Sequence, residues 1–205
     1  MRTLTLAVVV IAVTGIAVAA PRDRSHASDP HQPTARQYAK QTFGPAAIGR
    51  SAAGAGVSQL RNTPKEWGQG GAGFAKRFGS AFGTHVINNG IHYGVSRARH
   101  EEFGYRPSGK TGFGPRLKYA LTSTVITHKT TTGKRTVAAG QISGAFGSGL
   151  ISRAWQPAST RTIGSGLATG GVMMGATAGT NVVREFWPEI RHPRRHHAAK
   201  QPPTG

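Results

Sequence analysis

Glycine and serine return at every fourth position along two stretches of this chain. Because residues four apart share one face of an α-helix, each such row leaves a bare groove in which a second backbone can approach closely. The spacing therefore predicts closely packed helices over 136–155 and 162–186, joined by a turn at 156–160. The rows are Gly140-Gly144-Ser148, Gly166-Gly170 and Gly171-Gly175-Gly179.

Small residues also recur every four positions after residue 70, beside a row of phenylalanines. A spacing of four residues outruns the helical repeat by about 40° per step, so one straight helix cannot keep this row against one core. We expect a helix that begins at Thr63-Pro64-Lys65-Glu66 and bends or breaks at Gly83-Thr84 or at Asn89-Gly90. The small residues expected to pack helix against helix are Gly71, Ala75, Gly79, Gly83, Gly140, Gly144, Gly171, Gly175 and Gly179.

The middle of the chain has two interpretations. Glycines and prolines recur through 103–115, which we expect to be a loop. The apolar residues of 116–129 fall on one helical face and favour a helix. The β-branched run from Thr122 to Thr132 has poor helix propensity, so a short β-hairpin near 122–139, turning at Thr132-Gly133, is the alternative. The expected fold is all-α: a small bundle of glycine-rich helices with disordered N- and C-terminal tails.

The two ends of the chain are expected to lie outside the bundle. Residues 1–19 are typical of a signal peptide, with Arg2 before an apolar run that ends in small residues. An uncleaved N-terminal anchor is the alternative. After it we expect a linker with weak short helices at 20–62, a helical domain at 63–190 and a disordered basic tail at 191–205.

Positive charge is the main chemical signal. The chain has 26 Lys and Arg against 7 Asp and Glu, a net charge of +19, and ten of the basic residues lie between Glu102 and Glu185 with no acid among them. Such a field attracts lipid headgroups, lipopolysaccharide, acidic polysaccharide or nucleic acid, but stacking aromatics are too sparse for specific nucleic-acid recognition. The residues expected to contact anions are Arg106, Lys110, Arg116, Lys118, Lys134 and Arg135.

Several residue types required by familiar sites are missing. The chain has no cysteine, which excludes a disulfide scaffold and thiol chemistry, and no aspartate follows Asp29. Segment 104–111 matches the phosphate-loop pattern, but its surroundings are not a buried strand and a following helix, so we expect no nucleotide. The spacing of His85, His92 and His100 is too wide for a zinc helix and indicates a solvated polar face. We therefore expect no metal, no cofactor and no catalytic residue.

The segment Thr162–Val183 contains no charged residue and is just long enough to cross a bilayer. Its threonines, serine and asparagine make it only mildly apolar, and glycine disfavours a helix by about 1 kcal/mol relative to alanine. Close packing in a soluble bundle and insertion into a membrane as an oligomer both account for the spacing.

The last helical segment closes with Arg184-Glu185-Phe186-Trp187-Pro188. With Glu101–Ser108 and the Trp155-Gln156-Pro157 turn, this ending resembles a group of uncharacterised secreted proteins from soil acidobacteria, over roughly 64–190. The glycine rows resemble the glycine-zipper motif of bacterial envelope proteins. The resemblance to the acidobacterial group implies export and a shared fold but no reaction or ligand. Phe186 and Trp187 are expected anchors, packed on the bundle or seated at a lipid interface.

These features lead to two function hypotheses. The first is a non-enzymatic protein exported to the periplasm, the outer envelope or the extracellular space. Its helices would pack through small-residue grooves, with self-association or a membrane as partner and a basic surface facing anions. The alternative is a soluble secreted binder of an anionic polymer. An enzyme would have to rely on Glu66, Glu101 or Glu102 with a nearby histidine.

Overall fold

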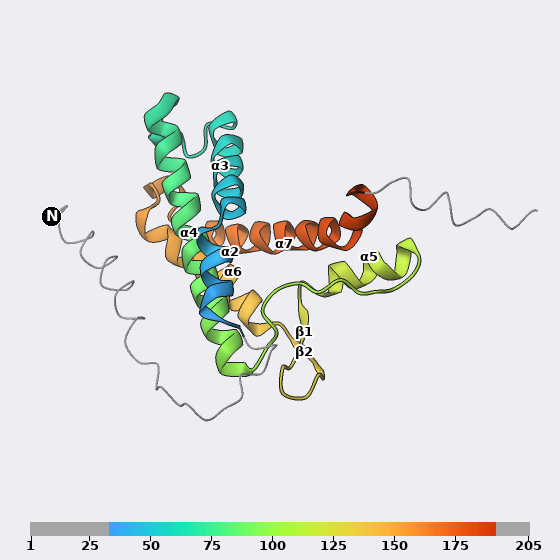
Figure 1. The fold of residues 1–205 in the computed structure, drawn as a ribbon. Coiled ribbons are helices and arrows are strands. Elements are labelled where there is room, and N and C mark those ends of the chain that lie inside the picture. The colour runs from blue at the N-terminus through green and yellow to red at the C-terminus, as the bar shows by residue number, and fades with distance from the viewer. Residues whose placement is uncertain (1–32, 192–205) are drawn as a thin grey trace, which may run out of the picture.

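A computed structural model of the chain describes residues 33–191. The described part is mostly helical, with one two-stranded antiparallel hairpin, as the sequence predicts (Figure 1). The expected signal peptide at 1–19 lies outside it, as does the expected tail at 191–205 except for Arg191, which ends the last helix. The elements are α2 (Ala35–Phe43), α3 (Pro45–Leu60), α4 (Gly70–Arg99), α5 (Phe113–Thr122), β1 (Ile126–His128), β2 (Arg135–Val137), α6 (Ala139–Ile151) and α7 (Ile163–Arg191), with short 3-10 helices at Lys65–Trp67, Ser152–Trp155 and Ala158–Thr160.

The long helix α4 forms the spine of the bundle. It packs against α3 and α6, and α6 in turn packs against α7. Helix α7 crosses the spine at a steep angle and extends beyond it to α5, as Figure 1 shows. The hairpin and α5 therefore lie on the side of the bundle toward which α7 extends.

Helix α4 differs from the expectation in two ways. It begins at Gly70, because residues 65–67 form a separate 3-10 turn, and it continues without a break to Arg99. The predicted break is absent, and the buried side chains drift around the helix and meet different neighbours. Asn89 donates a hydrogen bond to Thr42 of α2 over 3.1 Å, whereas the Asn88 carbonyl faces Gly144 of α6. A row of buried residues that turns around a helix can stay covered when different neighbouring helices pack on successive parts of it.

The sequence predicts a linker with weak short helices over 20–62, of which the structure describes 33–62. Helices α2 and α3 do form there, but both pack against α4, so the packed bundle begins before residue 63. A capping box starts α2: the Gln37 N–H donates to Thr34 Oγ1 over 3.2 Å, and the Thr34 N–H donates to Gln37 Oε1 over 3.0 Å.

The prediction of one helix over 116–129 is wrong in its second half, where the chain forms the hairpin. Helix α5 ends at Thr122, and Ile126 then pairs with Val137, so the alternative interpretation is confirmed. β-Branched side chains lose rotamer freedom in a helix but fit a strand pair, which explains the change at this point. Gly133 allows the turn, since its φ of 65° is in the left-handed region that favours glycine.

The turn between α3 and α4 is organised by Arg77, whose side chain is only 2% exposed. Its guanidinium donates to Gln59 Oε1 over 2.6 Å and to backbone carbonyls that include Gly68 over 2.7 Å and Pro64 over 2.9 Å. A charged residue on a face that the sequence marks as polar is thus the internal cross-link of this turn.

Small and polar side chains fill the interior. Within 33–191, the buried apolar side chains are five alanines, Pro33 and Phe103, whereas many larger apolar side chains, Leu60 and Val172 among them, are exposed. Helix contacts therefore depend on short backbone distances and on hydrogen bonds more than on large apolar side chains. Within residues 33–191, none of the helices combines the length and the apolar character needed to cross a bilayer.

Candidate functional site

Two of the predicted glycines lie where α6 crosses α4. A Cβ at Gly144 would lie 2.8 Å from the Asn88 carbonyl oxygen and 3.2 Å from His92 Cβ. A Cβ at Gly140 would collide with Ser96 Oγ and would lie 2.9 Å from the His92 carbonyl oxygen. These two positions hold the α4 and α6 backbones together as the spacing predicts.

The α6–α7 contact relies on other glycines. A Cβ at Gly170 would lie 2.9 Å from Phe146 Cα, and one at Gly166 would lie 3.2 Å from the Gly149 carbonyl oxygen. The rows named by the sequence include Gly166 and Gly170, but the expected packing residues do not, and Gly149 lies outside every row. The signal for Gly149 was its position in a glycine-rich helix, which alone does not indicate the face.

The remaining predicted packing residues do not make such contacts. A Cβ at Gly71, Gly79, Gly171, Gly175 or Gly179 would have no atom of the described chain within 4 Å beyond its own helix, and Ala75 is exposed. Gly83 makes only an ordinary contact, 3.9 Å from a ring carbon of Trp155. Gly171 follows Gly170 by one residue, or about 100° around the helix, so its row points away from α6. These positions therefore make no close helix contact within 33–191, and their packing against a second copy stays a prediction.

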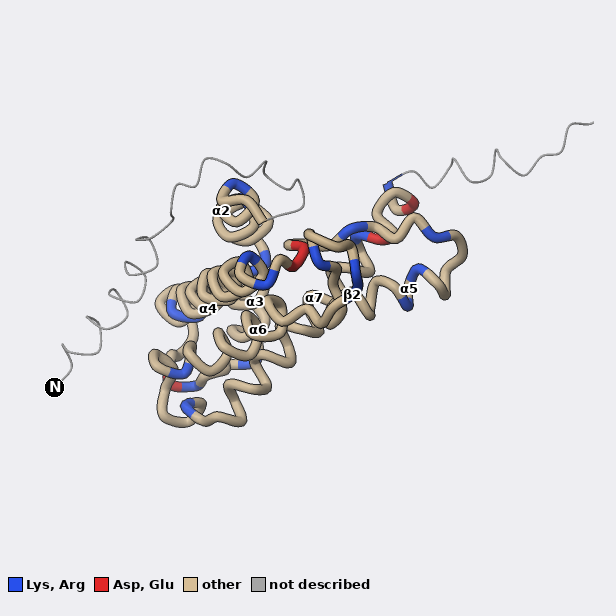
Figure 2. Tube along the Cα trace, turned by 90° about the horizontal axis from the view of Figure 1, so that it is seen from below, with Lys and Arg blue, Asp and Glu red and all other residues tan. Residues whose placement is uncertain are grey.

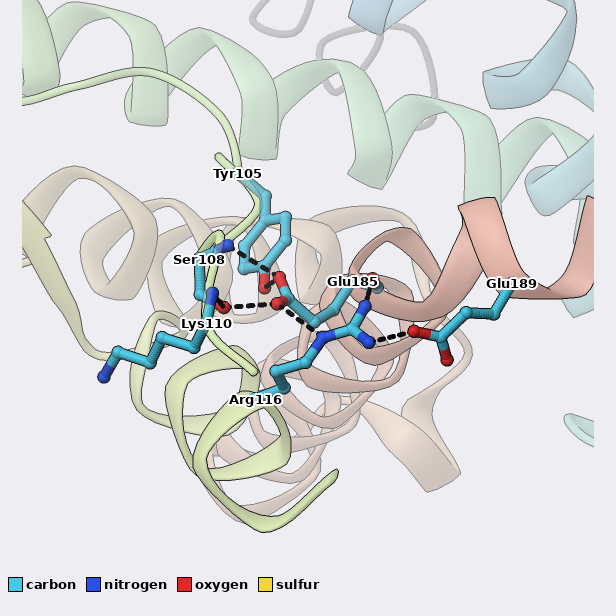
Figure 3. Close-up of polar contacts among 6 residues, drawn as sticks. All are labelled: Tyr105, Ser108, Lys110, Arg116, Glu185 and Glu189. Carbon is cyan, nitrogen blue, oxygen red and sulfur yellow. Dashed lines mark hydrogen bonds and ion pairs between the residues drawn. The ribbon is translucent and has the colours of Figure 1, made fainter. Parts of the chain in front are cut away.

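Glu185 is the centre of a polar cluster that joins α7 to the loop before α5 (Figure 3). Its carboxylate is 2% exposed. Tyr105 donates to it over 2.5 Å, the Ser108 N–H over 2.9 Å and Arg116 Nε over 3.2 Å, and the Ser108 hydroxyl also donates. The match to the phosphate-loop pattern thus lies in a loop that does hold an anion, but this anion is a side chain of the same protein.

Burial and hydrogen bonding act in opposite directions on Glu185. Burial alone would raise the pKa of this carboxyl, but the hydrogen bonds from Ser108, Tyr105 and Arg116 outweigh it and hold the pKa at about 2. The pKa of Tyr105 is raised, first by burial and then by its hydrogen bond to Glu185. Both shifts indicate that Glu185 is ionised and Tyr105 protonated at neutral pH.

Arg116 was expected to contact external anions, but in the structure it pairs with Glu185 and Glu189. Its guanidinium also lies 4.4 Å from the centroid of the Phe186 ring. Phe186 therefore packs within the bundle, which is one of the two positions expected for it. Trp187 is 47% exposed and contacts the Arg191 guanidinium at 5.7 Å.

The other predicted anion contacts lie at what we call the basic end: the loop 103–112, α5 and the hairpin. Figure 2 shows Lys and Arg gathered there around α5 and β2. Arg106 pairs with Glu102 over 3.3 Å, and Lys110 Nζ lies 5.4 Å from the centroid of the Tyr119 ring. The exposed cations Lys118, Lys134 and Arg135 have no side-chain partner within 33–191.

Both glutamates beside the basic end are engaged internally. Glu101 is 1% exposed, pairs with Arg99 over 2.7 Å and accepts the Gly140 N–H over 2.9 Å at the start of α6. Glu102 lies 3.8 Å from His128 Nδ1 and pairs with Arg106. Neither carboxylate adds free negative charge to this surface.

His85 and His92 are not on a solvated face, which corrects the expectation for them. Nε2 of His85 lies 3.2 Å from the Gln41 carbonyl oxygen and 3.1 Å from Asn89 Nδ2. The His92 ring packs on Phe103 with 4.5 Å between centroids. Within 33–191, no group of His, Asp and Glu side chains is arranged to hold a metal ion.

Burial lowers the pKa of His92 to about 4. Between that value and the ordinary 6.5 the unfolded chain binds a proton that the folded chain does not. We therefore expect the contribution of His92 to the free energy of unfolding to be constant above pH 6.5 and to fall by about 2 kcal/mol as the pH drops to 4. This value is smaller than the full pKa shift would give, because the His92 ring lines a cavity that admits water. Urea unfolding across this range measures the effect, with His92→Phe as the comparison. An equal slope in that variant would assign the loss to other groups.

The comparisons with known proteins return nothing similar. No protein-family model matches the chain, and neither curated proteins nor solved structures provide a match. The resemblance to secreted acidobacterial proteins stays a prediction. The function must therefore be argued from the residues themselves.

Proposed function

We propose that this is a non-enzymatic exported protein of the cell envelope that binds an anionic polymer through its basic end. The observation that carries the proposal is an imbalance of charge. The exposed cations Lys118, Lys134 and Arg135 of the basic end have no acidic partner within 33–191, whereas the glutamates nearest to them are buried or paired. Arg116 pairs with glutamates inside the protein, so it is not counted among the residues that contact an external anion. The remaining cations of the surface are long lysine and arginine side chains.

The physics favours a polymer over a compact ligand at this surface. Lys118 on α5 and Lys134 and Arg135 on the hairpin are spread over separate elements, so each can neutralise a different charge along a chain. Binding of that kind gains most of its free energy from release of counterions and is strongly dependent on salt. Long lysine and arginine side chains also tolerate variation in the spacing of the bound charges.

The test uses heparin as the probe polyanion. The triple variant Lys118→Gln, Lys134→Gln, Arg135→Gln should bind more weakly than the wild type, and the slope of log affinity against log salt should fall by about three units, one per cation. Affinity measured at several salt concentrations gives both values.

A matched control removes the same charge at the other end of the bundle. Arg61, Lys65 and Lys76 are exposed cations near the start of α4, and their replacement by glutamine changes the net charge equally. The control should keep most of the affinity. If both triple variants lose the same amount, net charge alone drives binding and the basic end is not the site.

A second candidate function is self-association through the outer face of α7. Gly171, Gly175 and Gly179 have open space around them, and Val172 beside them is 73% exposed. Exposed glycine on an apolar helix face is the arrangement that lets a second helix approach closely. This candidate is compatible with the first, because the outer face of α7 and the basic end consist of different residues.

A further inference from the structure

A cavity with a mixed polar and apolar lining, open to solvent on one side, lies between the helices of the bundle. Its volume is about 300 Å³, and residues from α2 through α7 and from β1 line it. A large part of the lining is amide and hydroxyl side chains, such as Asn88, Gln141 and Thr177. A cavity with this lining provides hydrogen-bond donors and acceptors for a polar molecule, since apolar cavities stay empty of polar guests.

Two arginines reach this cavity from helices far apart in the sequence. Arg50 comes from α3 and Arg184 from α7, and neither has a hydrogen bond or ion pair with another residue of 33–191. Arg50 and Arg184 line the same cavity, and burial, followed by the charge of Arg184, lowers the pKa of Arg50. Both side chains keep access to solvent, which provides a route into the cavity.

Within 33–191, the three arginines that are buried or half-buried are fully paired. Arg77 donates to side-chain and carbonyl oxygens, Arg116 binds two glutamates, and Arg153 donates to the carbonyls of Gly149 and Thr160. Like-charged groups that share a site without a counter-charge are unfavourable. Arg50 and Arg184 are exposed, but both line the cavity, and neither has such an acceptor within 33–191.

The carboxylates of the cavity do not supply that acceptor. Glu101 is used by Arg99 and Gly140, and Glu102 by Arg106. At the same end of the cavity, the hydroxyl of Ser96 is 1% exposed and has no hydrogen-bond partner. His85, which is close to Arg50, and Ser96 are eleven residues apart on α4, or roughly 16 Å. The cavity is therefore elongated, with unpaired cations toward one end and an unpaired hydroxyl toward the other.

We propose that the cavity binds a small anionic carbohydrate, with its carboxylate or phosphate group between Arg50 and Arg184 and its hydroxyl groups along Asn88, Gln141 and Ser96. Planar guanidinium groups bind carboxylate and phosphate oxygens in pairs, and amide and hydroxyl side chains bond sugar hydroxyls. The cavity borders the basic end, but Lys118, Lys134 and Arg135 do not line it, so the two proposed sites use different cations.

The test titrates the full chain with glucuronate and with glucose 6-phosphate at constant ionic strength. The His85 imidazole resonances serve as the reporter, since His85 lines the cavity. We expect saturable shifts with at least one of these two anions and none with glucose. Arg50→Gln and Arg184→Gln should each weaken that binding by about tenfold or more, as expected for loss of charge-assisted hydrogen bonds.

Two controls separate this site from general attraction and from the polymer surface. Arg61→Gln removes one exposed charge outside the cavity and should leave the affinity unchanged. The triple variant of the basic end should also leave it unchanged, even if heparin binding is lost. Absence of saturation with both anions, equal binding of glucose, or equal weakening by Arg61→Gln would each overturn the proposal.

Discussion

Replacing Glu185 with glutamine is expected to lower the free energy of unfolding by about 4 kcal/mol. Glutamine keeps the size of the side chain but removes a buried charge that accepts hydrogen bonds from Tyr105, Ser108 and Arg116. Arg116, with its side chain 15% exposed, would then be left with Glu189 as its single acidic partner. Urea unfolding at neutral pH measures the loss.

Glu189→Gln is the matched control for this prediction. It removes a carboxylate from the same arginine, but the Glu189 side chain is 40% exposed and water can replace it. The expected loss is at most about 1 kcal/mol. Equal losses in the two variants would show that the cluster acts only through surface charge and that the hydrogen bonds of Figure 3 contribute little.

The pH dependence gives an independent reading of the same carboxyl. Because the folded pKa of Glu185 is about 2, below the ordinary 4.5, its stabilising effect is complete above pH 4.5 and is lost as the pH falls toward 2. The wild type should therefore lose about 3 kcal/mol across this window, and Glu185→Gln should lose much less. This window lies below most of the one assigned to His92, so the two groups can be separated.

Much of the helical architecture could be predicted, because the positions of the helices depend on the spacing of residues that are close in the sequence. The glycine rows located α6 and α7, and the poor helix propensity after Thr122 pointed to the hairpin as an alternative. The faces of the helices were harder to predict. Gly170 and Gly171 both belong to four-residue rows, and only the position of α6 determines which one is covered. That choice is tertiary and leaves no trace in the spacing.

The polar contacts were the least predictable part. Arg116 and Glu185 are separated by 69 residues, and nothing near Arg116 in the sequence distinguishes it from Lys118. Excess positive charge made both residues equivalent candidates for external anions. The fold separates them, because α5 packs on the end of α7 and brings one cation to Glu185 while the other remains in solvent. For the same reason, the sequence did not indicate that Arg50 and Arg184 line one cavity.

The glycines themselves allow the sharpest test of the packing. Gly144→Leu is expected to lower the free energy of unfolding by about 4 kcal/mol, because even the first atom of the new side chain would lie 2.8 Å from the Asn88 carbonyl oxygen. The backbone of α4 cannot yield as a flexible side chain would, so α6 must move away. Thermal and urea unfolding measure the change.

Gly175→Leu introduces the same side chain on the outer face of α7, where a Cβ meets nothing within 4 Å. Leucine is a better helix former than glycine, so the monomer should gain up to about 1 kcal/mol. The two substitutions thus differ in sign, although both positions belong to four-residue glycine rows. Sedimentation of the same variant tests the second function: self-association through this face requires Gly175→Leu to shift the protein toward the monomer, because leucine keeps two helices apart. Unchanged association would leave the α7 face without a role in assembly, and a loss of stability equal to that of Gly144→Leu would contradict the outward orientation of the row.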